Sequence, residues 1–76
     1  MINVKNKDLL KAIGSRIRDL RLQRNISQES LAYEADIPIS QIGRIERGEI
    51  NPTISTLYVI SIALQVTLKD IIDISI

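Results

Sequence analysis

Cysteine and histidine are both absent from this chain of 76 residues. Their absence excludes disulfide bonds and zinc sites built from these residue types. It also excludes catalysis by a histidine base or a cysteine nucleophile. The sequence shows no phosphate-binding loop, no metal-ligand cluster and no paired carboxylates in their place. We therefore expect neither an enzyme nor a protein that holds a metal or a cofactor.

Long apolar runs are absent as well, and aromatic residues make up only 3% of the chain. The longest nearly apolar stretch, residues 54–66, is interrupted by polar side chains and is too short to cross a bilayer. No apolar signal-peptide segment opens the sequence. These absences lead us to expect a cytoplasmic protein with no membrane association.

The chain does have a hydrophobic fraction of 45%, dominated by isoleucine, which indicates a folded aliphatic core rather than disorder. A domain of this size buries only about 60% of the surface that its unfolded chain exposes. Without a disulfide or a metal, a second copy of the chain is the obvious remaining source of stability. The sequence therefore predicts a single domain over residues 1–76 that forms a homodimer.

The net charge of +1 conceals an uneven distribution of charged residues. Residues 1–48 carry nine Lys and Arg against six acids, whereas residues 49–76 carry one Lys against three acids. A basic first part favours contact with a polyanion, and an acidic, apolar second part favours a different partner. A solvated helix face with a chance imbalance explains the charges equally well, so charge alone leaves both interpretations open.

Apolar residues recur with helical spacing throughout the chain, as in the stripe Leu10, Ile13, Ile17 and Leu20. The predicted helices cover residues 7–24, 28–35, 38–47, 54–64 and 68–74. Ser27, Thr53 and Thr67 are expected as N-caps, and Pro38 is expected in the first turn of its helix. Helix ends are expected at Asn25, Asp36 and Gly48. Asp70, three residues after Thr67, comes close to completing a capping box. The pattern predicts an all-α bundle of five short helices.

Residues 28–47, QESLAYEADIPISQIGRIER, have the spacing of two helices that cross steeply over a tight turn. Ala32 is small where the helices would cross, and Asp36 occupies the turn. Ile37, Ile42 and Ile45 are expected to point inward and to hold the second helix in place. That orientation leaves an outward-facing set made of Ile39, Ser40, Gln41 and Arg44. A helix held in this way fits the major groove of DNA.

Three linked motifs carry a family resemblance. SQESLA, IGRIERGEINPT and LQVTLKDI resemble segments of the Cro/CI-type (XRE) transcriptional regulators, and the resemblance covers about residues 10–72. The chain departs from the family pattern in the turn, where Asp36 replaces the usual Gly and Pro38 the usual Ser or Thr. The resemblance implies a five-helix, lambda-repressor-like DNA-binding domain with a central helix-turn-helix at residues 28–47.

The resemblance also implies which side chains contact double-stranded DNA. With helix 38–47 in the major groove, base contacts are expected from Ile39, Ser40, Gln41 and Arg44. Contacts to phosphates are expected from Arg16, Ser27, Gln28, Arg47, Asn51 and Thr53. Three alternatives stay open: a phosphate contact or a solvated charge for Arg44, a plain surface position for Gln28, and coverage of the turn by Ile39.

Arg21 and Glu46 stand apart from this contact set. In the family, an Arg late in the first helix pairs with the Glu of the IERG segment, and both positions match here. The resemblance therefore implies a partly buried ion pair that fixes the recognition helix. Its role is architectural and does not involve contact with DNA.

The predicted helix 54–64 is apolar almost all round, and the core of a small domain is insufficient to cover it. We expect a dimerisation surface within residues 54–76, formed by Tyr58, Ile62, Leu68, Ile71, Ile72 and Ile74. The alternative is that all of these residues belong to the core. A symmetric dimer would set two recognition helices about 34 Å apart and would match a roughly palindromic operator.

Two classes of function remain open from the sequence. One is a stand-alone regulator of transcription, similar to restriction–modification controllers and small phage repressors, with no small-molecule effector evident. The other is an antitoxin that neutralises a toxin protein and represses its own operon; the lack of a toxin-wrapping tail after Ile76 disfavours it. A purely structural module is disfavoured by the outward polar residues Ser40, Gln41 and Arg44.

Overall fold

The computed structural model describes residues 6–76, and this part of the chain is all helical, without strands. Its five helices are α1 (Asn6–Gln23), α2 (Gln28–Ala35), α3 (Ile39–Glu46), α4 (Ile54–Leu64) and α5 (Leu68–Ile71). The predicted five-helix, all-α architecture is confirmed, and the bounds of α2 and α4 are those expected. Both ends of α1 and both ends of α3 differ from the predicted bounds by one residue, and α3 begins at Ile39 rather than Pro38. The largest error is at α5, which ends at Ile71 rather than Ile74.

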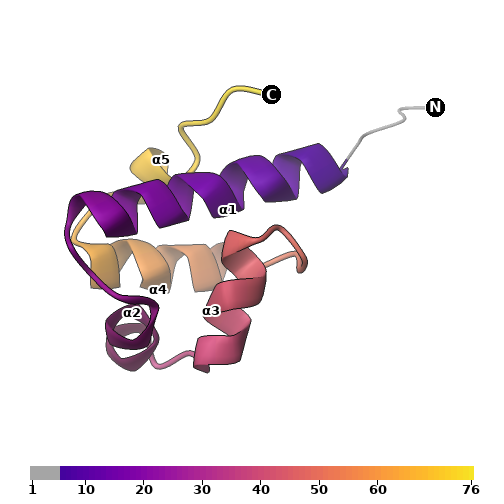
Figure 1. Ribbon diagram of the computed structural model, residues 1–76. Helices are drawn as coiled ribbons and strands as arrows, with labels where there is room; N and C mark the ends of the chain where they lie inside the picture. Colours follow the sequence, from indigo (N-terminus) through magenta and orange to yellow (C-terminus); the bar gives the residue numbers. More distant parts are fainter. Residues whose placement is uncertain (1–5) are drawn as a thin grey trace.

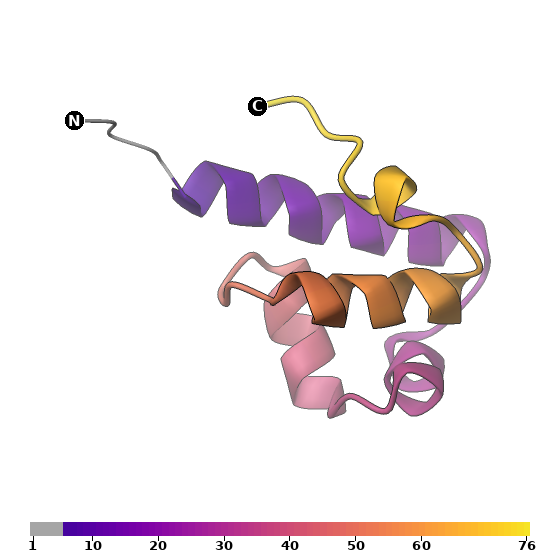
Figure 2. The ribbon, with the colours of Figure 1, turned by 180° about the vertical axis from the view of Figure 1, so that it is seen from behind.

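The helices are arranged around α1 and α4, which lie one above the other in Figures 1 and 2. Helices α2 and α3 lie on one side of this pair, and α5 with the C-terminal segment lies on the other. Helix α3 contacts both α1 and α2, while α5 contacts α1 and α4. The helix-turn-helix thus occupies one end of the molecule, away from the C-terminal segment.

A single aliphatic core joins all five helices. Its largest fully buried side chains include Ile17 of α1, Leu31 of α2, Ile42 of α3, Ile60 of α4 and Ile71 of α5. Because each helix contributes at least one of these residues, none packs independently of the others. The full burial of Ile71 corrects the expectation that this residue lies on a dimer surface.

Local side-chain chemistry sets most helix starts. The hydroxyls of Ser27, Thr53 and Thr67 each accept a hydrogen bond from the backbone N–H three residues later. At α5, Asp70 completes a capping box by accepting from the N–H of Thr67 at 3.0 Å. Such caps satisfy backbone donors that have no partner inside the helix.

Pro38 has φ −55° and ψ 139°, so its backbone is still extended and it precedes α3 as the N-cap. Its φ suits a helix, but its ψ does not, which moves the first helical residue to Ile39. Asn25 and Asp36, at φ 56° and 55°, adopt the left-handed conformations that were predicted for them. Gln65 does so as well, at φ 59°, and ends α4.

Gly14 allows α1 and α3 to approach closely. A Cβ at this position would lie 2.8 Å from the carbonyl carbon of Glu46 and closer still to the carbonyl oxygens of Ile45 and Glu46. Any larger residue would push the two backbones apart. The glycine therefore determines how deeply α3 packs against α1.

Across residues 6–76, no helix is long and apolar enough to cross a bilayer.

Candidate nucleic-acid interface

A tight turn sets α2 and α3 at a steep angle (Figure 1). Asp36 ends α2 in the left-handed conformation, and its N–H points back to the carbonyl oxygens of Ala32 and Tyr33. The N–H of Ile37 then donates to the carbonyl oxygen of Ala32 at 3.0 Å. These bonds satisfy the last carbonyls of α2 and redirect the chain sharply into α3.

Helix α3 is held by its inner face and open on its outer face. Ile42 and Ile45 are buried at 0% and 2% exposure. On the opposite side Ile39, Ser40 and Arg44 are exposed, and Gln41 is half-buried. The structure therefore brings all four side chains predicted to contact bases onto one accessible helix, in the orientation expected.

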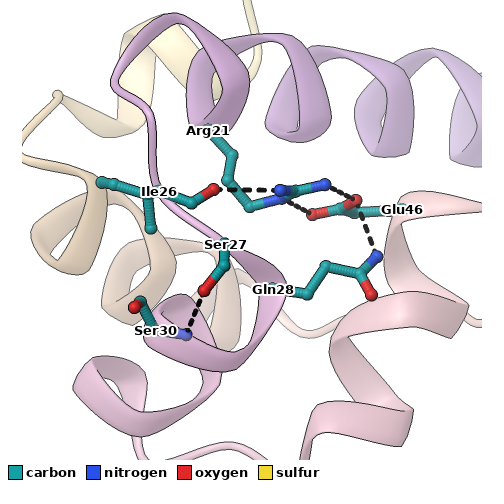
Figure 3. A network of polar contacts seen from close by, with 6 residues as sticks. All are labelled: Arg21, Ile26, Ser27, Gln28, Ser30 and Glu46. Carbon is teal, nitrogen blue, oxygen red and sulfur yellow. Dashed lines mark hydrogen bonds and ion pairs between the residues drawn. The ribbon is translucent and has the colours of Figure 1, made fainter.

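A buried polar network ties α3 to α1 (Figure 3). Arg21 Nε donates to Glu46 Oε2 at 2.7 Å, and Arg21 Nη2 donates to Glu46 Oε1 at 2.9 Å. Arg21 Nη1 donates to the carbonyl oxygen of Ile26 at 2.9 Å. Both charged residues are only 7% exposed. This geometry is a bidentate ion pair, which combines charge with fixed direction.

Gln28, the first residue of α2, extends this network. Its Nε2 donates to Glu46 Oε1 at 3.0 Å, as Figure 3 shows. Sequence reasoning assigned Gln28 only to phosphate contact or to a plain surface position, and it missed this bond. The N-terminus of α2 is thereby bonded to Glu46 of α3, and through Glu46 it is linked to Arg21 of α1. Backbone N–H groups at this N-terminus favour an anion.

The remaining predicted phosphate contacts divide into two groups. Ser27, Arg47, Asn51 and Thr53 are exposed near the N-terminus of α2 or on the loop from α3 to α4. Arg16 does not join them, because its Nε donates to the carbonyl oxygen of Asp70 at 2.7 Å and thus lies against α5. The structure gives Arg16 a role in packing α5 on α1 rather than a position beside α3.

Glu49 is a residue of this surface that sequence reasoning did not single out. Its Oε2 accepts a hydrogen bond from Arg47 Nε at 2.6 Å, and its Oε1 lies 3.9 Å from Arg44 Nε. Its N–H donates to the carbonyl oxygen of Arg44 at 2.9 Å. The hydrogen bond from Arg47 holds the pKa of the Glu49 carboxyl below its ordinary value. Two predicted DNA-contacting arginines thus share one carboxylate.

Several predicted dimer residues are exposed and others are not. Tyr58, Ile62 and Ile72 are 55%, 58% and 48% exposed. Leu68 and Ile74 are half-buried against the core. Ile54, at 62% exposure, extends the open face of α4 by one turn toward its N-terminus.

A rigidly held outer helix crossed steeply by a second helix defines a helix-turn-helix DNA-binding domain. The helix-turn-helix family model (HTH_3) matches residues 17–71, which is most of the chain. The chain therefore belongs to the helix-turn-helix family, of the Cro/CI (XRE) type, and is a DNA-binding regulator of transcription.

Two curated relatives illustrate the family. Control protein C.BamHI of Bacillus amyloliquefaciens is 43% identical over 61 residues, which are 79% of this chain and 75% of the relative. The immunity repressor protein of Bacillus phage phi105 is 35% identical over 60 residues, which are 79% of this chain and 42% of the repressor. Both are named as control or repressor proteins, not as enzymes.

Solved structures agree with this assignment. The restriction–modification controller protein C.AhdI of Aeromonas hydrophila superposes with a TM-score of 0.79 at 33% identity, over 84% of this chain and 96% of the controller. A regulator of the same family from Vibrio cholerae gives a TM-score of 0.84 at 28% identity, over 88% of this chain and 38% of that protein. The predicted lambda-repressor-like fold is confirmed.

Proposed function

We propose that this chain is a transcriptional regulator of the restriction–modification control type. It binds a roughly palindromic operator as a homodimer, with α3 in the major groove. The observation that carries the proposal is the state of α3: its inner face is locked by Ile42, Ile45 and the Glu46 ion pair, while Ser40 and Arg44 stay exposed. A fixed helix with a free polar face loses little conformational entropy when it reads base edges.

The outer residues of α3 have the chemistry for base recognition. Gln41 suits adenine, Arg44 suits the O6 and N7 atoms of guanine, and Ile39 suits a thymine methyl group. The N-terminus of α2 and the loop after α3 supply groups for the neighbouring phosphates, which set the register of the protein on the duplex. Gln28 can donate its remaining amide hydrogen to a phosphate oxygen, while its bond to Glu46 fixes its position.

The homodimer is supported by the open face of α4. Ile54, Tyr58 and Ile62 follow one another at four-residue intervals and form one stripe, and each is more than half exposed. A stripe of large apolar side chains that the domain's own core leaves uncovered is typical of a contact surface. A two-fold axis there would present two copies of α3 to successive turns of the same DNA face.

The antitoxin alternative gains no support from the relatives. C.BamHI is named a control protein and the phi105 protein an immunity repressor. The structures of C.AhdI and C.Esp1396I are named as restriction–modification controllers. We therefore favour the control-type regulator over a toxin-binding protein.

Selection of duplexes from a random library tests this function. The wild type should enrich two inverted half-sites whose centres lie about one helical turn apart, roughly 34 Å. Arg44→Ala and Gln41→Ala should each relax base preference at one position of every half-site, at a cost of about 1–3 kcal/mol. Enrichment of no sequence, or of a single unrepeated half-site, would contradict the proposal.

A further inference from the structure

We infer that Glu49 is a specificity-determining residue that restrains Arg44 and Arg47 and lowers affinity for non-operator DNA. The inference rests on the proposed function, since it concerns the same DNA-facing surface. Glu49 carries a negative charge on the part of the molecule that faces a polyanion. Its position between two of the arginines assigned to DNA contact calls for an explanation in terms of binding.

The geometry shows a restraint that acts mainly on Arg47. Arg47 Nε lies 2.6 Å from Glu49 Oε2, and Arg47 Nη2 lies 3.4 Å from Glu49 Oε1. Both nitrogens of one guanidinium edge therefore face both oxygens of one carboxylate. Arg44 Nε lies 3.9 Å from Glu49 Oε1, near the outer limit of an ion pair. All three side chains are about half exposed, so the cluster is reachable from solvent and from DNA.

Gly43 makes room for the restrained arginine. An added Cβ at Gly43 would lie 3.0 Å from Arg47 Nη1. The Arg47 guanidinium therefore lies back along the surface of α3, beside Gly43, instead of extending away from the domain. The loop is fixed as well, because the Glu49 N–H donates to the carbonyl oxygen of Arg44. Glu49 thus stays beside the arginines without depending on its own side chain for position.

This arrangement weakens non-specific binding more than specific binding. Affinity for unrelated DNA comes almost entirely from cations that neutralise phosphates. Arg47 has to leave Glu49 before it can contribute fully to that term. At an operator, hydrogen bonds of fixed geometry to base edges hold α3 in one register, so a backbone phosphate stays beside Arg47 and replaces Glu49 as its partner. In a non-specific complex the register is not fixed, and the lost contact to Glu49 is not compensated in this way. Glu49 therefore widens the difference between the two affinities.

The test compares Glu49→Gln with wild type on an operator duplex and on a mixed-sequence duplex, by fluorescence anisotropy at several salt concentrations. Glu49→Gln should bind the mixed-sequence duplex about two- to fivefold more tightly, as expected for release of an exposed ion pair, and should gain less on the operator, so discrimination falls. The salt dependence on the mixed-sequence duplex should steepen by about 0.9 for each further phosphate neutralised. The charge-matched control is Asp19→Asn, because Asp19 lies by Arg16 and Asp73 on the α5 side of α1.

A second comparison separates restraint from simple charge. In an Arg47→Ala background, adding Glu49→Gln should give a much smaller gain, close to that of Asp19→Asn. A full gain in that background would mean that the carboxylate acts directly on DNA, and would overturn the inference. So would an equal effect of Glu49→Gln and Asp19→Asn in the wild-type background. If the wild type does not discriminate between the duplexes at all, the proposed function itself fails.

Discussion

The buried carboxylate of Glu46 fixes the recognition helix α3 through its hydrogen bonds. Its carboxylate accepts two hydrogen bonds from Arg21 and one from Gln28, and its side chain is 3% exposed. Removing one partner of such a pair leaves the other charge buried and uncompensated, which costs far more than the net value of the pair. The network therefore matters chiefly for keeping α3 in one position.

We expect Glu46→Ala to lower the free energy of unfolding by about 3–5 kcal/mol. Gln28→Ala, which removes one hydrogen bond and leaves the ion pair in place, should cost about 1 kcal/mol. Urea unfolding at neutral pH measures both. A Glu46→Ala protein as stable as Gln28→Ala would show that Arg21 is not held as a buried charge.

The sequence was sufficient to predict some of these residue contacts and not others. Arg21 and Glu46 were expected to pair because the family pattern places them at matching positions. The bonds from Gln28 to Glu46 and from Arg47 to Glu49 depend on rotamers and on the path of the loop after Gly48, which has φ 72°. No spacing rule encodes that path, so the shared carboxylate of Glu49 became visible only in three dimensions.

At the scale of elements, local chemistry predicts starts better than ends. Ser27, Thr53 and Thr67 act on N–H groups only three residues away, so their capping roles follow from sequence. The end of α5 depends instead on tertiary packing. Ile74 packs against the core, and the chain leaves the helix at Ile72. Helical periodicity alone extended α5 to Ile74, because it does not account for that contact.

The capping box of α5 should give stability a dependence on acid pH. Hydrogen bonds from Thr67, first its backbone N–H and then its hydroxyl, hold the pKa of Asp70 below its ordinary 3.8. A carboxyl whose folded-state pKa is lowered stabilises the fold above its unfolded value and loses that effect as pH falls through the folded value. The contribution should therefore be present above about pH 5 and disappear below 3.8.

Thermal unfolding of Asp70→Asn and wild type across that range tests this expectation. The variant should melt lower than wild type near neutral pH, and the two melting temperatures should converge as the pH falls. Thr53→Ala removes a cap without a carboxylate and should cost about 1 kcal/mol at every pH. A constant difference between Asp70→Asn and wild type at all pH values would contradict the account.

The contact between α1 and α3 should not tolerate a methyl group at Gly14. Alanine favours a helix over glycine by about 1 kcal/mol, but here its Cβ would overlap backbone atoms of Ile45 and Glu46. Overpacking of this kind costs about 1–3 kcal/mol or more, so Gly14→Ala should be destabilised overall. Ser15→Ala, at an exposed position of the same helix, should be neutral or slightly stabilising. Calorimetry measures the melting temperatures of both variants. A Gly14→Ala protein that melts at or above the temperature of the wild type would show that the contact between α1 and α3 tolerates the methyl group.

At the level of the whole molecule, the sequence predicts more apolar surface than one small domain can bury. The exposed apolar residues of α4 agree with this prediction. Its open stripe of Ile54, Tyr58 and Ile62 lies on the side away from the buried Leu57, Ile60 and Leu64. Ile71 was assigned wrongly because periodicity in a four-residue helix does not separate it from Ile72. In the folded chain Ile71 is buried in the core and Ile72 is exposed.

If the open face of α4 forms the dimer, a charge there should dissociate it. Ile62→Glu should sediment as a monomer at concentrations where the wild type is dimeric, because an unpaired carboxylate would be buried in the interface. The matched control is Leu22→Glu, at another large apolar residue, 52% exposed near the end of α1. A dimer that survives Ile62→Glu, or one that Leu22→Glu dissociates, would place the interface elsewhere.

A titration with two duplexes shows whether α3 reads base sequence. Wild-type protein is added to the selected palindromic duplex and to a duplex of the same composition with both half-sites scrambled, at several salt concentrations. We expect at least about 10³-fold tighter binding to the palindrome, with a steep salt dependence on both duplexes. Equal affinity for the two duplexes, or no binding by folded protein at low salt, would show that α3 does not read base sequence.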